Sequence, residues 1–128
     1  MPLPPPRILL VMQEQWPRAL LRATLIEAGY DAIGARTCEE ALRTPVAVAD
    51  RGPVRLLLID AAVLRTPGNC ETLARRMTGA ARVLIAPAAG PRAPNSWNRI
   101  IRRPTSIGDV VREIQSLVPL GESATGSV

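Results

Sequence analysis

Short, continuous runs of apolar residues alternate with helical patterns along this chain, and this alternation constrains the fold more than any other feature. The clearest runs lie at 8–12, 56–59 and 83–86. A strand that is apolar throughout is buried on both faces, which is typical of a parallel sheet between two layers of helices. The sequence therefore predicts an α/β fold. The expected strands are 8–12, 31–35, 54–59, 83–86 and 100–101.

Helical patterns occupy the intervals between these strands. We expect helices after Pro17, Thr37, Asn69 and Ser106, because proline suits a first helical turn and the other three side chains can cap a helix. Thr37 and Ser106 each have an acidic residue three positions later, which is the spacing of a capping box. The residues that should end the four helices are, in order, Gly29, Pro45, Gly79 and Pro119.

Loops and chain ends are indicated by proline, glycine and small polar residues. These residues predict irregular backbone at 44–53 and 87–98. The proline-rich lead at 1–6 is expected to be disordered, and 119–128 to be a flexible tail. Residues 7–118 are then one domain, long enough to bury a core without help from a metal.

The composition excludes several kinds of catalytic and metal site. All sixteen basic residues are arginine, so lysine and histidine are both absent. A Schiff-base lysine, an imidazole base and a histidine metal ligand are therefore ruled out, and we expect no enzyme, no cofactor and no metal. The two cysteines, Cys38 and Cys70, lack the spacing of a metal or redox motif. They are expected to be small, half-buried hydrophobic residues rather than a disulfide.

Charge and hydropathy limit the partners and the location. The net charge of +5 invites a nucleic-acid partner, but the arginines are dispersed along the chain and only three aromatic residues are present. That is too few for a stacking platform, so a nucleic-acid partner is disfavoured. No apolar run approaches the ~20 residues of a membrane span, and the proline-rich start does not suit a signal peptide. A cytoplasmic protein is expected.

Several segments, taken in order, resemble the receiver domain of bacterial response regulators. They are ILLV at 8–11, LIEAGYDAIGA at 25–35, EEAL at 39–42, LLLID at 56–60, Gly68 and the pair Arg103-Pro104. The resemblance covers 7–118 and implies a flavodoxin-like, three-layer sandwich whose five parallel strands have the order 2-1-3-4-5. The segment from Pro87 to Arg103 is shorter than in the family and contains Pro91 and Pro94. The family's fourth helix is therefore expected to be shortened or absent.

The resemblance also implies where the family's phosphorylation chemistry would lie. In that family an aspartate at the end of the third strand accepts a phosphoryl group, and Asp60 matches it. Two acidic residues that hold Mg²⁺ are replaced by Met12 and Gln13, the hydroxyl residue by Pro87 and the lysine by Arg103. Thioether and amide groups are poor magnesium ligands, and proline cannot donate a hydrogen bond, so the pocket is predicted to be degenerate and free of metal.

The loss of these groups predicts a new partner for Asp60. The fork of Arg103 pairs with carboxylates and reaches further than a lysine. We therefore expect a direct Asp60–Arg103 salt bridge at the strand ends, where the metal and the phosphoryl group would otherwise lie.

Three functions remain open at this point. The leading hypothesis is a non-phosphorylated, receiver-like domain that acts as a protein–protein interaction module in bacterial signal transduction. Its candidate interaction surface consists of Arg92, Trp97, Arg99 and Arg102. The first alternative is a phosphate-accepting receiver of a two-component phosphorelay that uses Asp60. The second is a basic accessory factor that binds nucleic acid. The partner is expected to be another protein of unknown identity, and a homodimer stays open.

Overall fold

The computed structural model describes residues 4–45, 47–65, 67–89 and 97–120. Six strands, four α-helices and one 3₁₀ helix follow one another along this part of the chain. The strands are β1 (Arg7–Val11), β2 (Asp31–Ala35), β3 (Ala47–Val48), β4 (Gly52–Asp60), β5 (Ala81–Ala86) and β6 (Arg99–Arg102). The helices are α1 (Gln15–Ala28), α2 (Cys38–Ala41), η1 (Ala61–Arg65), α3 (Pro67–Arg76) and α4 (Ile107–Leu117).

Five of the strands form the predicted parallel sheet. Their order is β2-β1-β4-β5-β6, and because β3 lies off this path, it is the expected order 2-1-3-4-5. Every pairing along the path is parallel. The fold class predicted from the apolar runs is therefore confirmed.

A short hairpin replaces part of the loop predicted at 44–53. β3 pairs antiparallel with the start of β4, and residues 49–51 form the loop between them. The amide of Arg51 donates to the carbonyl oxygen of Val48 at 3.0 Å, and Gly52 has a φ of +81°, a conformation that favours glycine. The prediction of irregular backbone is thus wrong for β3 and for the first residues of β4.

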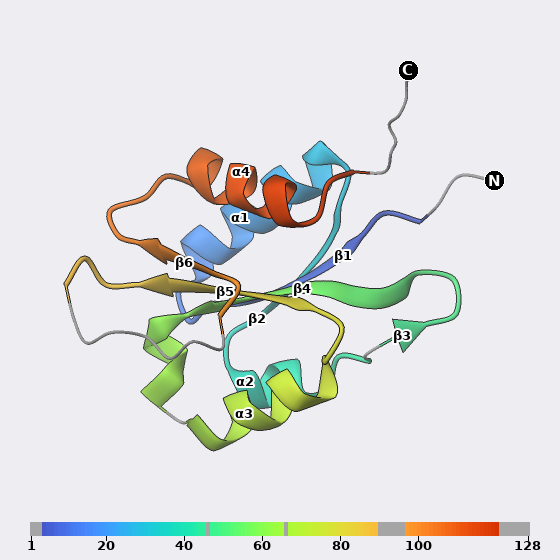
Figure 1. Ribbon diagram of the computed structural model, residues 1–128, viewed down its shortest axis with the longest axis horizontal. Coiled ribbons are helices and arrows are strands. Elements are labelled where there is room, and N and C mark those ends of the chain that lie inside the picture. The colour runs from blue at the N-terminus through green and yellow to red at the C-terminus, as the bar shows by residue number, and fades with distance from the viewer. Residues whose placement is uncertain (1–3, 46, 66, 90–96, 121–128) are drawn as a thin grey trace.

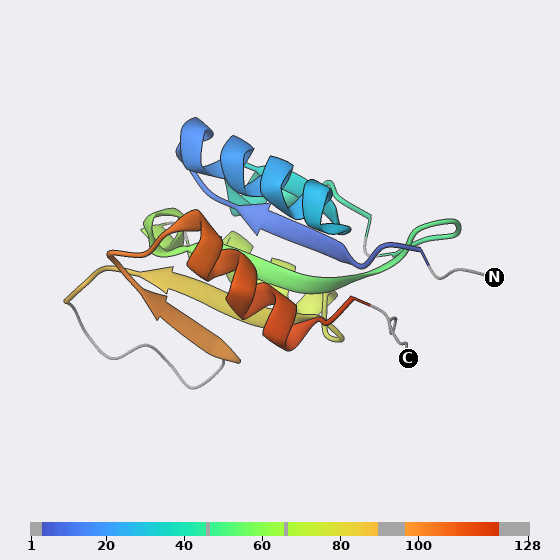
Figure 2. The same cartoon turned by 90° about the horizontal axis from the view of Figure 1, so that it is seen from above.

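Two layers of helices cover the sheet. α1 and α4 lie side by side on one face, and α2 and α3 lie on the other (Figures 1 and 2). Alternate residues of each central strand serve the two layers. In β1, Ile8 and Leu10 join the core cluster that includes Leu25 of α1, whereas Leu9 and Val11 join the cluster on the other face. This alternation explains why the strand is apolar throughout.

The helix ends follow the predicted capping residues in most places. Gly29 has a φ of +110° directly after α1, and the Thr37 and Ser106 side chains accept hydrogen bonds from the amides of Glu40 and Asp109. α1 begins at Gln15, ahead of Pro17. α2 is a single turn, and α3 begins at Pro67, ahead of the cap predicted at Asn69.

The cysteine prediction is wrong, because Cys38 and Cys70 form a disulfide. Both side chains are buried rather than half-buried. Cys38 opens α2, and Cys70 lies in the first half of α3, so the two crossover helices bring these residues together on the same face of the sheet. Their Cα atoms are 5.2 Å apart, which suits a disulfide.

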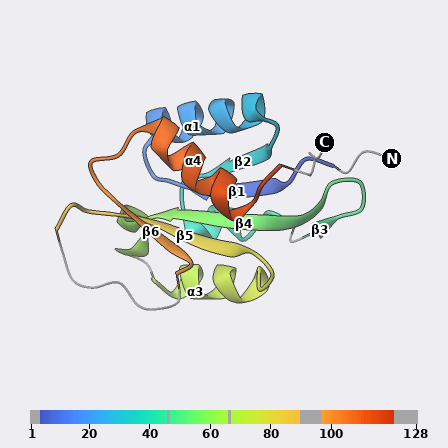
Figure 3. The ribbon, with the colours of Figure 1, turned by 45° about the horizontal axis from the view of Figure 1, so that its top comes forward.

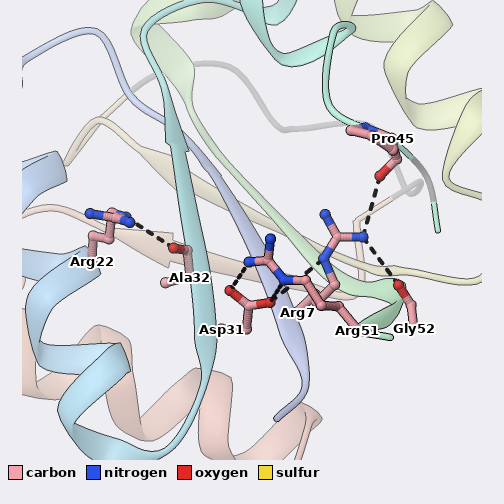
Figure 4. A network of polar contacts seen from close by, with 7 residues as sticks. All are labelled: Arg7, Arg22, Asp31, Ala32, Pro45, Arg51 and Gly52. Carbon is pink, nitrogen blue, oxygen red and sulfur yellow. Dashed lines mark hydrogen bonds and ion pairs between the residues drawn. The ribbon is translucent and has the colours of Figure 1, made fainter. Parts of the chain in front are cut away.

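Arg7, Arg51 and Asp31 form a network of polar contacts at the end of the sheet where β1 and β2 begin (Figure 4). Arg7 is only 2% exposed, and its Nη1 atom donates to the carbonyl oxygens of Pro45 at 3.3 Å and Gly52 at 3.1 Å. Both carboxylate oxygens of Asp31 accept from Arg51, and one of them also lies 3.8 Å from Nε of Arg7. The network therefore ties the hairpin to the first two strands.

The chain ends of the described region pack on the domain. The Pro6 carbonyl oxygen accepts from the amide of Asp31 at 2.9 Å, and Leu120 packs against Gly29 and the core cluster beneath α1 and α4. Residues 1–3 and 121–128 lie outside the described ranges, so the predicted disordered lead and flexible tail stay predictions. Among the described helices, none is both long enough and apolar enough to cross a membrane.

Candidate functional site

A pocket opens at the edge where the parallel strands end. The carboxyl ends of such strands meet at one edge, and ligand sites of open α/β sheets form there. In Figure 3 the strands β1, β4 and β5 all run toward the same side of the molecule. The pocket has a volume of about 890 Å³. Its lining residues are Gln13, Glu14, Asp60, Ala61, Ala62, Pro87 and Arg103.

Asp60 is the last residue of β4 and is only 8% exposed. Its Oδ1 atom accepts a hydrogen bond from the amide of Ala62 at 3.0 Å. Its Oδ2 atom accepts from Nη2 of Arg103, so the two side chains form the direct salt bridge that the sequence predicted. Each carboxylate oxygen therefore has a donor of its own.

Arg103 reaches this position because it directly follows β6. Its amide donates to the carbonyl oxygen of Ala86 at 2.9 Å, which extends the pairing of β5 with β6 by one step. The side chain is 43% exposed, whereas that of Asp60 is 11% exposed. A carboxylate that is mostly withdrawn from water needs such a partner, because a buried, unpaired charge is costly.

Neither of the two positions directly after β1 carries an acidic side chain. Met12 is buried in the core cluster beneath α1 and α4, so its side chain points away from solvent. Gln13 brings a neutral amide, and Glu14 and Asp60 are two carboxylates that line the pocket. In the part of the chain that the structure describes, no three His, Cys, Asp or Glu side chains are grouped so that they could share a metal ion. The two positions directly after β1 thus bring a buried thioether and a neutral amide, both poor ligands for magnesium, and the metal-free pocket stays a prediction.

Arg18 is a feature of this edge that sequence reasoning missed. Its Nη1 atom donates to the carbonyl oxygens of Met12 at 2.8 Å and Gln13 at 3.3 Å. A guanidinium group thus caps the carbonyl end of β1, although Arg18 is not among the residues that line the pocket. The available signal was an arginine in the first turn of the helix that follows a strand, because such a side chain can fold back over the strand end.

Pro87 is another of the predicted departures from the family pattern. It is exposed, and its carbonyl oxygen accepts from Nη1 of Arg102 at 3.3 Å. It has neither a hydroxyl nor an amide proton, so it cannot donate a hydrogen bond to an anion.

The structure describes three of the four residues of the candidate interaction surface predicted from the sequence, Trp97, Arg99 and Arg102. Trp97 is partly buried and packs against the core cluster on the α2 and α3 face. Arg99 pairs with Glu113 of α4 at 2.5 Å, on the opposite face of the sheet. Arg102 is exposed beside Pro87, and Arg92 lies outside the described residues. As an interaction surface the set stays a prediction, but the structure separates Trp97 from Arg99.

An apolar groove beside the pocket was also missed. Trp16 is 83% exposed and Leu20 is 52% exposed, and they lie one turn apart on α1. They border a groove of about 300 Å³ between the start of α1 and the segment that leads from β6 into α4. The other lining residues are Met12, Pro17, Leu21, Ile85, Arg103, Thr105, Ser106, Ile107 and Val110. The i,i+4 spacing of a tryptophan and a leucine is the signal in the sequence for this apolar stripe.

Solved structures with a similar arrangement are receiver domains. The signal receiver domain of an HD domain-containing protein from Pseudomonas fluorescens Pf-5 has a TM-score of 0.70 and 19% sequence identity, over 94% of this chain and 99% of that one. A response regulator receiver domain protein from Methanospirillum hungatei JF-1 has a TM-score of 0.69 and 17% identity, over 94% and 99%. A two-component response regulator from Clostridium difficile has a TM-score of 0.70 and 15% identity, over 88% and 95%.

These likenesses concern the fold, because all three identities are low. No protein-family model and no curated protein matches the sequence.

Proposed function

We propose that this chain, whose fold is that of a response regulator receiver domain, binds another protein without being phosphorylated itself. The observation that carries the proposal is the ion pair between Asp60 and Arg103. In this arrangement the guanidinium group of Arg103 lies where an incoming phosphoryl group would approach the carboxylate. The domain then holds one conformation that does not depend on a phosphoryl donor.

The donors on Asp60 oppose its use as a phosphate acceptor. One oxygen accepts from the amide of Ala62 and the other from Arg103, and each of these hydrogen bonds makes the oxygen that accepts it a weaker nucleophile. Phosphoryl transfer depends on cations that neutralise charge on the transferred group. Met12 and Gln13, directly after β1, bring no carboxylate that could hold a metal cation there.

The groove bordered by Trp16 and Leu20 is the surface that best supports protein binding. Exposed tryptophan is enriched at the energetic centres of protein interfaces, and a contiguous apolar patch is uncommon on a monomer surface. Arg103 lies at the border of this groove, and the whole chain carries a net charge of +5. We therefore propose a protein partner that inserts apolar side chains flanked by carboxylates.

Phosphorylation is tested by mass spectrometry of the intact protein after incubation with acetyl phosphate and Mg²⁺. We expect no mass gain, and no spectral change with beryllofluoride. A gain of one phosphoryl group that disappears in Asp60→Asn would overturn the proposal and favour the phosphate-accepting alternative.

Binding is tested with a partner captured on the immobilised chain, then purified and titrated by calorimetry. Trp16→Ala should weaken the affinity by roughly tenfold or more, the size typical of a buried aromatic anchor. Ile26→Ala is the matched control, because Ile26 is 46% exposed on the same helix but does not line the groove. Equal affinity in both variants, or affinity that requires a phosphoryl donor, would contradict the proposed function.

A further inference from the structure

The disulfide is the covalent link between the two helices on one face of the sheet. Cys38 is the first residue of α2, and Cys70 lies in α3 (Figure 1). They are the two cysteines of the whole chain. Cys38 is 1% exposed and Cys70 is 5% exposed, and both lie in the core cluster that contains Leu9 and Leu73.

The surroundings of the disulfide also suit two free thiols. Sγ of Cys70 lies 3.7 Å from the carbonyl oxygen of Val63, which could accept a weak hydrogen bond from a Cys70 thiol. Both cysteines belong to an apolar core cluster, and a reduced cysteine packs as a small hydrophobic residue. After reduction, each thiol would therefore still lie in an environment that suits it.

The two helices keep a second link when the disulfide is broken. Nη1 of Arg76, the last residue of α3, donates to the carbonyl oxygen of Leu42 at 2.6 Å, directly after α2. The contacts of Leu73 and Ala41 in the same core cluster also remain. We therefore expect reduction to loosen this layer rather than to unfold the domain.

η1 connects this layer to the strand-end pocket. It begins directly after Asp60 and contains both Ala62, whose amide donates to Asp60, and Val63, which faces Cys70. We therefore expect that a change in the packing of α3 also changes the position of the η1 backbone, which carries one of the two donors to Asp60.

We propose that Cys38 and Cys70 form a redox modification site, and that reduction by a dithiol loosens α3 and η1 beside Asp60. In this reaction a thiolate of the dithiol attacks one sulfur, the Cys38–Cys70 bond breaks, and a mixed disulfide forms. The second thiol of the dithiol resolves that intermediate. The protein gains two electrons and two protons as two thiols, and the dithiol becomes a disulfide. This inference does not rest on the proposed function.

The test combines thiol alkylation with hydrogen exchange on the intact chain. The oxidised protein is incubated with dithiothreitol without denaturant, and iodoacetamide then counts the thiols by mass. We expect two alkyl groups after reduction and none before it. Amide exchange at 61–64 and 70–76 should become faster by roughly tenfold or more, because a conformational constraint has been removed. Exchange in β1, β4 and β5 should stay unchanged.

The double variant Cys38→Ala, Cys70→Ala is the matched control. It should show the faster exchange at 61–64 with and without dithiothreitol. Any of three results would overturn the proposal. The protein could keep two thiols after treatment with an oxidant, the disulfide could be reduced only when the amides of the whole sheet also exchange, or amide exchange at 61–64 could stay unchanged after reduction. The wild-type measurements decide the matter even if the double variant does not fold.

Discussion

At the scale of single residues, Asp60 illustrates how one buried carboxylate depends on its donors. Removing the guanidinium in Arg103→Ala leaves the amide of Ala62 as the donor to Asp60 among the described residues. We expect the free energy of unfolding to fall by about 1–3 kcal/mol, because a mostly buried carboxylate loses its ion pair. Asp60→Asn should cost less, since an amide oxygen can still accept from Ala62. Urea unfolding of the three proteins checks both values.

Arg112→Ala provides the matched control for that experiment. Arg112 also pairs with an aspartate, Asp109, but both side chains are well exposed on α4. Exposed pairs contribute little, so no change in stability is expected. If Arg103→Ala is as harmless as Arg112→Ala, then the Asp60–Arg103 pair does not stabilise the pocket.

The two arginines that share Asp31 should respond unequally to substitution. Asp31→Ala leaves Arg7 as a buried cation without a carboxylate, and we expect it to destabilise the fold by about 2–4 kcal/mol. Arg51→Ala should cost much less. Its side chain is half exposed, and Nε of Arg7, which has no hydrogen-bond partner in the described structure, lies 3.8 Å from Asp31 and can replace it. Thermal unfolding of both variants would contradict this view if Arg51→Ala were the more damaging.

At the scale of elements, the sequence predicted the features that depend only on residues close together along the chain. The apolar run at 56–59 and the glycine at 29 specify a buried strand and a helix end through contacts that any such sequence makes. The β3–β4 hairpin and the disulfide were not foreseen. Val48 meets Gly52 only once the loop has closed, and Cys38 meets Cys70 only after the crossovers have placed α2 beside α3. The spacing of these residues along the sequence does not predict such contacts, because they form only in the tertiary fold.

Tyr30 links two distant elements, and its ionisation should make stability depend on alkaline pH. Its hydroxyl group donates to the carbonyl oxygen of Val118 at 2.6 Å, which ties the start of β2 to the end of α4. Burial raises the pKa of Tyr30 above its ordinary value of about 10. The folded state therefore holds the proton more tightly than the unfolded state. This stabilisation is complete below the unfolded pKa and is lost as the pH rises through the folded pKa.

Tyr30→Phe tests this linkage. At neutral pH it should lower the free energy of unfolding by about 1 kcal/mol, because the carbonyl oxygen of Val118 loses a buried donor. Chemical unfolding between pH 8 and 11 should show the difference from the wild type shrinking as the pH rises. A difference that stays constant over this range would show that Tyr30 does not contribute to the alkaline loss of stability.

At the scale of the whole molecule, the pocket was more predictable than the binding surface. Strand ends meet at one edge in any parallel sheet, so Asp60, Pro87 and Arg103 could be placed together from the sequence. Which side chains remain on the surface depends on which side chains are buried in the core. Trp97 packs against the core cluster on the α2 and α3 face, whereas Trp16 remains exposed. The spacing that groups Trp16 with Leu20 does not show whether the core covers them.

The distribution of charge over the molecule leads to a last prediction, on nucleic acid. Eleven of the described arginines have a polar partner within the domain. Carboxylates pair with Arg7, Arg36, Arg51, Arg99, Arg103 and Arg112, and backbone carbonyl oxygens bind Arg18, Arg22, Arg76, Arg82 and Arg102. A nucleic-acid site instead needs several cations on one face, each of which releases a counterion from the phosphates. We therefore expect weak binding to duplex DNA that does not depend on its sequence and disappears near 0.15 M salt, about physiological strength.

Salt titration separates the two kinds of partner in one experiment. Fluorescence anisotropy of a labelled duplex and of the protein partner is measured over a series of salt concentrations. The apolar groove at Trp16 and Leu20 should make the protein affinity change little with salt, because burial of apolar surface needs no counterion release. If the DNA affinity is saturable and its logarithm falls with a slope equivalent to about five or more released counterions, the basic-factor alternative is correct. In that case the arginines bind nucleic acid together as one surface, even though they are dispersed over the fold.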